Sequence, residues 1–229
     1  MAQSKNNIIQ ANTFEVSKVR FGTPKSLDNG GKHIPIYYDG DPFMVQTPKM
    51  RTPYGVNRWE NPGSDVKLSI DLSYGNFGED PKLGSFHEMM HSLNQLFLRA
   101  ALDNSSAWFK KKYSSIDVME ALYTSLIKVP KDKLTNEPSD TYPPTFKVSL
   151  QQKNGKDNFE LYDESRTKID SLASVEMKGA DLVAIIQCNG IWIAGGKFGC
   201  TWRAVQMKVY PSKVHMKRFA FKEDPEEDY

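Results

Sequence analysis

The sequence predicts a mainly β protein with inserted helices, and three observations support this prediction. Asp-Gly or Asn-Gly pairs separate short strand-like runs and predict hairpins at residues 39–40, 154–155 and 189–190. Apolar and polar residues alternate from Val66 to Ser73, as in a strand with one wet face. Helical spacing of apolar residues is confined to the middle of the chain.

Two further strands are predicted, one from Phe14 to Phe21 and a long one from Phe198 to Tyr210. If the long strand is regular, one face carries Val205, Met207 and Val209 toward the core. The opposite face then carries Trp202, Gln206, Lys208 and Tyr210. Glycines at 195, 196 and 199 predict a bulge or close backbone approach, with Lys197 and Phe198 at a turn.

Two helices are predicted in the middle of the chain. The first runs from about Ser85, its expected N-cap, to Asp103. Its apolar stripe consists of Phe86, Met89, Met90, Leu93, Phe97 and Ala100. The second runs from Ile116 to Lys128, with Ser114 or Ser115 as its cap.

The charge distribution divides the chain into a basic body and an acidic tail. Residues 1–222 are expected to form one domain with a helical insertion at about 82–130. Residues 223–229 form the tail, whose five acids are Glu223, Asp224, Glu226, Glu227 and Asp228. The other 222 residues hold 30 Lys and Arg against 23 Asp and Glu, a charge of +7. Such a body favours an anionic partner.

Composition excludes several other classes. No apolar run is long enough to cross a bilayer and no signal peptide is evident, so an intracellular location without membrane binding is expected. Cys188 and Cys200 lie in apolar, strand-like sequence, which predicts two reduced, buried thiols. No phosphate-binding loop motif occurs, so neither a nucleotide cofactor nor any other cofactor is expected.

The stretch HEMMH at 87–91 has the His-Glu-x-x-His spacing of zinc proteases. A third ligand is required, yet Asn94 and Phe97 occupy the positions where one protease class has glycine and histidine. Glu120 is the alternative third ligand. The motif also lies at the first turn of its predicted helix, where fraying would position a metal poorly. We therefore predict no metal and no enzyme, and keep a zinc hydrolase as the minor alternative.

Basic and aromatic residues occur together in two segments. The loop TPKMRTPYGVNRWENPG carries Lys49, Arg51, Tyr54, Arg58 and Trp59. The second segment carries Lys197, Phe198, Trp202, Arg203, Lys208 and Tyr210. Cations that follow phosphates and rings that stack on bases together favour single-stranded nucleic acid. The alternative is that the aromatic residues are core anchors.

The stretch GGKFGCTWRAVQMKVYP, the central helices and the ending EDPEEDY resemble an uncharacterised family of large DNA viruses of algae and protists. More remotely, the chain is similar to the acidic-tailed single-stranded DNA-binding proteins of short-tailed phages. The resemblance implies an OB-fold-like five-stranded barrel with a helical insertion. It also implies a tail, ending in Tyr229, that competes with DNA and recruits replication partners.

The resulting expectation is sequence-independent binding of single-stranded DNA in viral replication, recombination or repair. A viral DNA polymerase or helicase is the expected partner of the tail, and the host nucleus or a cytoplasmic replication site is the expected location. A structural or assembly protein of a virus particle or replication complex is the main alternative, and would use the same surface for protein partners. The sequence leaves open whether the chain forms a homodimer and whether it prefers DNA to RNA.

Overall fold

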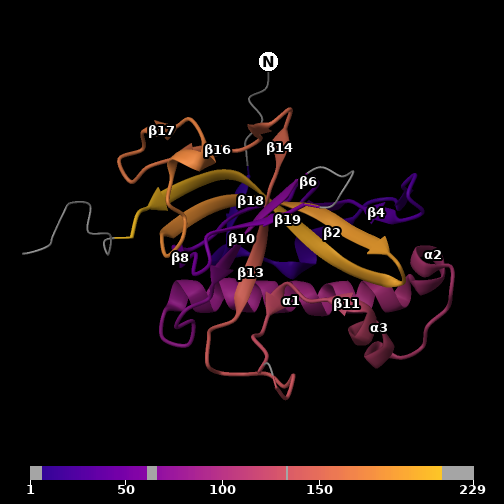
Figure 1. The fold of residues 1–229 in the computed structure, drawn as a ribbon. Coiled ribbons are helices and arrows are strands. Elements are labelled where there is room, and N and C mark those ends of the chain that lie inside the picture. The colour runs from indigo at the N-terminus through magenta and orange to yellow at the C-terminus, as the bar shows by residue number, and fades with distance from the viewer. Residues whose placement is uncertain (1–6, 61–65, 133, 213–229) are drawn as a thin grey trace, which may run out of the picture.

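The computed structural model describes residues 7–60, 66–132 and 134–212. Its fold is mainly β with a few helices, which confirms the predicted fold class. In Figure 1 the longest helix, α1 (Pro81–Asp103), runs along one side of the main sheet. The short helices α2 (Ser105–Phe109) and α3 (Ile116–Leu122) lie near one end of α1.

The main sheet is built around two long strands that pair with each other, β18 (Asp181–Ala194) and β19 (Lys197–Tyr210). Across the sheet the order is β1 (Ile8–Gln10), β7 (Met44–Gln46), β18, β8 (Met50–Arg51), β10 (Lys67–Ser73), β13 (Thr145–Leu150), β19, β16 (Glu160–Tyr162) and β17 (Lys168–Ile169). Shorter strands branch from this path: β3 (Lys25–Ser26), β4 (Lys32–Ile34), β9 (Val56–Trp59), β11 (Tyr123–Thr124) and β12 (Ile127–Lys128).

Two smaller sheets and three short 3-10 helices complete the described fold. One sheet contains β2 (Val19–Phe21), β5 (Ile36–Tyr38) and β6 (Asp41–Pro42), and the other contains β14 (Gln152–Lys153) and β15 (Lys156–Asp157). The 3-10 helices are η1 (Ala11–Thr13), η2 (Val16–Lys18) and η3 (Leu172–Ser174). The strand predicted from Phe14 to Phe21 is therefore a strand only over its last three residues.

Two of the three predicted hairpins are confirmed, at 39–40 between β5 and β6 and at 154–155 between β14 and β15. The prediction at Asn189-Gly190 is wrong, because both residues lie within β18 and the turn to β19 falls at Gly195-Gly196. Gly190 has φ +103°, and a Cβ there would lie 2.3 Å from the carbonyl oxygen of Ile34. This glycine therefore permits close approach of β4 at a bulge.

A second irregularity changes which residues of β19 face the core. Ile185 pairs with Gln206 while Ile186 pairs with Ala204, so Val205 has no partner in β18. A residue inserted on one strand shifts the alternation of its side chains by one. Trp202 and Ala204 are consequently buried before the bulge, and Met207 and Val209 after it. The prediction that Trp202 and Lys208 share a face is therefore wrong.

Helix α1 begins at Pro81, because its N-cap is Asp80, five residues before the predicted cap Ser85. The Asp80 carboxylate accepts hydrogen bonds from the backbone amides of Lys82 and Leu83, and Pro81 suits the first helical position. Ser85 instead donates its hydroxyl proton to the Pro81 carbonyl, at 2.8 Å. The predicted apolar stripe from Phe86 to Ala100 is confirmed, since all of its members are buried.

Helix α3 has the predicted cap, with the Ser115 hydroxyl accepting from the Asp117 amide, but it is shorter than predicted. It ends at Leu122, because the following residues pair as β11 with β19 and as β12 with β13. Asn94 of α1 holds this segment: its Oδ1 accepts from the Tyr123 hydroxyl at 2.7 Å and from the Leu126 amide at 3.0 Å. Strand pairing and this buried amide outweigh the local helical pattern.

The core lies between α1 and the inner face of the sheet, where Phe146 of β13 packs against Phe86 of α1 with ring centroids 5.6 Å apart. Cys188 and Cys200 are free and buried, as predicted, with their sulfurs 3.4 Å apart. Of the helices that the structure describes, none combines the length and apolar composition needed to cross a bilayer.

Candidate nucleic-acid interface

The outward face of β10 and β13 presents a polar, mainly cationic surface. Along β10, Leu68, Ile70 and Leu72 are buried, so the alternate residues point away from the core. On one side, Trp59 of β9 is the register partner of Lys67. On the other side, Ser149 and Lys147 of β13 are the partners of Ser69 and Asp71. Strand pairing thus brings side chains from residues 59, 67 and 147 onto one surface.

Trp59 is the most favourable stacking residue on this surface, because 65% of its side chain is exposed. Its neighbour across the strands, Lys67, is also exposed. The adjacent Arg58 pairs with Leu68 and points to the other side of the sheet, where its guanidinium forms an ion pair with Glu60. The predicted pair Arg58 and Trp59 is therefore split between two faces.

Lys128 and Lys147 form a close cationic pair that the sequence analysis missed. Lys128 lies on β12 and Lys147 on β13, next to Asp71. Partial burial and then the Lys147 charge lower the pKa of Lys128, while the Asp71 carboxylate opposes this shift. Alternation along β13 could have indicated Lys147 as an outward residue, but nothing local indicates that β12 pairs with β13.

Arg203 of β19 extends the surface from β13. Ser149 is its partner in the parallel pairing of β13 with β19, and its guanidinium donates to the Gln187 side-chain oxygen at 2.6 Å. We call the set Trp59, Lys67, Lys128, Lys147 and Arg203 the β10–β13 patch. The patch holds four cations. Asp71, the register partner of Lys147, is an acid beside them, and its carboxylate accepts a hydrogen bond from Asn57 Nδ2 at 2.8 Å.

A second group of predicted residues gathers at the far end of β19, and we call Lys49, Lys208 and Tyr210 the Tyr210 patch. The amine of Lys49 lies 4.2 Å from the centre of the Tyr210 ring, and that of Lys208 lies 5.3 Å from it. Lys49 also lies 3.7 Å from the Asp181 carboxylate. These contacts bring the loop before β8 and the end of β19 together, with two cations around an aromatic ring.

An acidic network lies between the two patches. Glu160 of β16 accepts from Gln206 at 2.7 Å, from the Tyr162 hydroxyl at 3.0 Å and from Lys168 at 3.1 Å. These bonds, led by the one from Lys168, lower the pKa of Glu160, so its carboxylate stays charged. The cationic surface along β19 is therefore interrupted at Gln206.

Arg51 lies on β8 beside the Tyr210 patch, because its partner in β18, Asp181, is also the register partner of Tyr210. Other predicted residues lie apart from both patches. Tyr54 is 58% exposed, and with Arg58 it lines a separate cavity of about 550 Å³ that also contains Asp157 and Glu176. Lys197 is exposed beside the turn between β18 and β19.

Phe198 and Trp202 were predicted to contact nucleic acid, and the structure contradicts this because both are buried. Phe198 packs against Phe109 and Tyr123, with centroid distances of 5.4 and 5.0 Å. Trp202 is 1% exposed and packs against Phe43 at 5.1 Å. Both side chains face the core because, before the bulge at Val205, the even-numbered residues of β19 point inward. Neither ring can stack on a base in this structure.

The HEMMH histidines do not gather further ligands. His87 stacks on Phe77 with centroids 4.2 Å apart, and burial and then the charge of His91 lower its pKa. Within residues 7–60, 66–132 and 134–212, no cluster of three or more His, Cys, Asp or Glu could hold a metal. His87 lies in the second turn of α1, so the argument from helix fraying was wrong.

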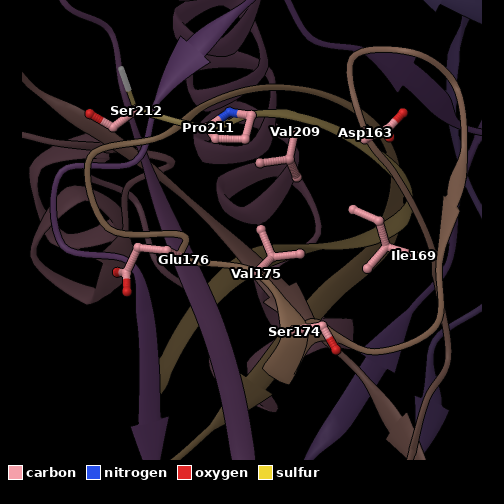
Figure 2. Close-up of a pocket in the computed structure, with 8 residues that line it drawn as sticks. All are labelled: Asp163, Ile169, Ser174, Val175, Glu176, Val209, Pro211 and Ser212. Carbon is pink, nitrogen blue, oxygen red and sulfur yellow. The ribbon is translucent and has the colours of Figure 1, made fainter. Parts of the chain in front are cut away.

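Figure 2 shows a cavity of about 370 Å³ at the end of β19. Its centre is apolar, formed by Ile169, Val175 and Val209, while Asp163 and Glu176 lie at its edge. An apolar centre with acids at the edge does not suit phosphate, so this cavity is not part of the interface. The predicted tail residues Glu223, Asp224, Glu226, Glu227, Asp228 and Tyr229 lie outside the described residues.

The fold is similar to that of phage single-stranded DNA-binding proteins. The protein of bacteriophage Enc34, solved in complex with single-stranded DNA, matches with a TM-score of 0.50 and 10% identity, over 85% of this chain and 97% of that chain. The gp2.5 protein of bacteriophage T7, also a single-stranded DNA-binding protein, matches with a TM-score of 0.46 and 11% identity, over 79% of this chain and 98% of that chain.

Sequence comparison identifies a family but no characterised relative. Among curated proteins, none matches the sequence. The model of a family of unknown function, DUF5871, matches residues 82–223, which is more than half of the chain. The matched region runs from the first turn of α1 through β19. The chain therefore belongs to the family of unknown function DUF5871.

Proposed function

We propose that the protein binds single-stranded DNA without sequence preference and without catalysis, through the β10–β13 patch. The observation that carries this proposal is Trp59, whose exposed ring lies beside Lys67 on a strand face that also holds Lys128, Lys147 and Arg203. The fold likeness to a phage single-stranded DNA-binding protein supports the same proposal.

The chemistry of the patch suits a single strand better than a duplex. Cations attract phosphates of any sequence, and an indole face stacks on any base, contributing about 1 to 3 kcal/mol per base. Bases of a duplex are already stacked and paired, so Trp59 could not stack on them without unpairing. The Tyr210 patch would extend the contact to the far end of β19.

The proposal includes regulation by the acidic tail. Five acids tethered to a body of charge +7 are present at high effective concentration and mimic phosphates. The tail would compete with DNA for the cationic patches and, once displaced, recruit a DNA polymerase or helicase of a virus. The roles in replication, recombination or repair, the viral origin and the location at a replication site belong to this proposal.

The first test measures binding of a fluorescent oligothymidine by anisotropy, with increasing salt and with duplex competitor. The four cations of the β10–β13 patch alone predict a slope of about −3 for log K against log salt, and the two lysines of the Tyr210 patch would bring it to about −4, since each phosphate contact on a single strand contributes about −0.7. Duplex should compete poorly. Replacing Trp59 with alanine should weaken binding by about 1 to 3 kcal/mol.

The matched control is Tyr142→Ala, because Tyr142 is an aromatic residue of similar exposure, 63%, on the loop before β13. Its removal should leave the affinity unchanged. If the protein bound neither oligothymidine nor duplex, the proposal would fail, and a structural or assembly role would replace it. Equal losses in the two variants would show that the β10–β13 patch is not the contact surface.

A further inference from the structure

A cavity of about 580 Å³ with a mixed polar and apolar lining lies beside the Tyr210 patch, where β1, β7 and β18 meet the start of α1. Three side-chain amides, two amines and one carboxylate line it: Gln10, Asn12, Gln46, Lys49, Lys82 and Asp80. Val183 and Pro48 contribute apolar surface. Lys49 also belongs to the Tyr210 patch, so the cavity and that patch are continuous.

Strand pairing fixes the walls of the cavity. Gln10 of β1 is the register partner of Gln46 in β7, and Gln46 is in turn the partner of Ile185 in β18. The next residue, Thr47, is locked to β18: its amide donates to the Ala184 carbonyl at 2.8 Å, and its hydroxyl accepts from the Ala184 amide at 3.0 Å. Gln10 and Gln46 are therefore held on paired strands, and Asn12 follows in η1, so this wall of the cavity is preformed.

The cations of the cavity come from side chains, because the N-terminus of α1 is already occupied. Asp80 Oδ1 accepts from the amides of Lys82 and Leu83, at 2.8 and 3.2 Å. Lys49 forms an ion pair with the Asp181 carboxylate at 3.7 Å, and both partners are about half exposed. An exposed pair of this kind is weak, so a phosphate can compete for Lys49.

The lining matches the parts of a nucleotide. Amide side chains donate and accept hydrogen bonds at once, as the edges of nucleobases require. Val183 and Pro48 offer apolar contact to a base, and Lys49 and Lys82 offer charge to a phosphate. The volume falls within the range of small-molecule sites, about 300 to 1,000 Å³.

We infer that this cavity holds one nucleotide of the bound strand, with its base against Gln10, Asn12 and Gln46 and its phosphate between Lys49 and Lys82. The inference rests on the proposed function and deepens it. Val183 is the cross-strand partner of Lys208, so a strand that follows the outward face of β19 to the Tyr210 patch arrives at the cavity. The side-chain amides would then recognise the base at one position of the bound strand, while the other contacts remain independent of sequence.

The test follows the side-chain amide signals of Gln10, Asn12 and Gln46 by NMR while thymidine monophosphate is added to the full chain. Deoxyribose 5-phosphate, which lacks a base, is the control ligand. Thymidine monophosphate should shift these signals, and the sugar phosphate should not. Gln46→Leu should weaken nucleotide binding by roughly three- to tenfold, as expected for one lost hydrogen bond.

The matched control variant is Gln95→Leu, because Gln95 is an exposed glutamine on α1 outside the cavity. It should bind the nucleotide like the unchanged chain. Unmoved amide signals, equal shifts with the sugar phosphate, or equal affinity of Gln46→Leu would each overturn the inference.

Oligothymidine anisotropy on the same samples separates this failure from that of the proposed function. Oligonucleotide binding without nucleotide shifts would leave the proposed function standing and remove the cavity from it. Nucleotide shifts without oligonucleotide binding would show a nucleotide site in a protein that does not bind single strands.

Discussion

Lys147 of the β10–β13 patch lies close to a like charge, Lys128, in the free protein. Partial burial of Lys128 and then the charge of Lys147 lower the pKa of Lys128, so the two amines repel each other when no anion is present. A phosphate between them would relieve that repulsion. If the proposed function holds, the pair would be better suited to the bound state than to the free state.

We predict that Lys147→Gln weakens oligothymidine binding and makes the salt slope shallower by about 0.7, because one phosphate contact is lost. The same change should leave the free energy of unfolding unchanged or slightly raised, because Lys128 no longer faces a like charge. Anisotropy and urea unfolding measure the two effects. Lys153→Gln, an exposed lysine on β14, should change neither quantity.

His87 gives a prediction about pH. Burial and the charge of His91 lower its pKa in the folded state, so below an unfolded pKa of about 6.5 the unfolded chain binds more protons. The free energy of unfolding should therefore fall as pH drops below about 6.5, and level off below the folded pKa. Urea unfolding between about pH 7.5 and 5 should show a smaller fall in His87→Gln.

The control for this prediction is His91→Gln, since His91 is exposed and lies on the same helix. It should keep most of the pH dependence. An undiminished fall in His87→Gln would assign the proton to another group.

Residue by residue, the sequence predicted the candidate surface only in part. Trp59 is exposed, and Lys49, Lys208 and Tyr210 come together, which the sequence did not predict. The predictions for Phe198 and Trp202 are wrong because the exposure of both side chains depends on which face of β19 they occupy. The bulge at Val205 exchanges the inward and outward positions along that strand. The local residues do not reveal which position is inserted, because bulges follow from pairing with the neighbouring strand.

Among the elements, the hairpin of β18 and β19 requires a glycine at one position inside β18, Gly190. Gly190 has φ +103°, and a Cβ there would lie 2.3 Å from the Ile34 carbonyl oxygen and 2.9 Å from His33 Nε2. The backbone atom cannot move away without breaking the pairing of β4 with β18. Gly190 is therefore required by both conformation and space.

We predict that Gly190→Ala lowers the free energy of unfolding by more than about 2 kcal/mol, because strain and a steric clash add. Gly40→Ala is the matched control: Gly40 also has positive φ, but nothing lies within 4 Å of its added Cβ. It should cost about 1 to 2 kcal/mol. Equal costs in thermal or urea unfolding would show that contact with β4 is unimportant.

Helices and local hairpins were predictable where a short stretch decides them. The stripe of α1 and the turns at 39–40 and 154–155 are local patterns. The residues after Leu122 were predicted to be helical but form β11 and β12. Strand pairing with β19 and β13 and the hydrogen bonds to Asn94 outweigh their local helix propensity. Distant partners of this kind are not visible in a local pattern.

For the whole molecule, the separation of charge between body and tail predicts self-inhibition. A chain that ends at Lys222 should bind oligothymidine more tightly than the full chain, because a competing anion has been removed. The difference should shrink as salt rises, since screening weakens both interactions. A variant in which the five tail acids become amides should match the truncated chain. Equal affinities of full and truncated chains at low salt would contradict self-inhibition.

The most direct test of binding at the β10–β13 patch is tryptophan fluorescence during titration with oligothymidine. Of the four tryptophans, Trp59 is 65% exposed, Trp108 and Trp202 are buried, and Trp192 is half-buried. Stacking on Trp59 should quench the emission of the unchanged protein. In Trp59→Phe the quenching should disappear while most of the affinity remains. Binding with undiminished quenching in Trp59→Phe would contradict the account.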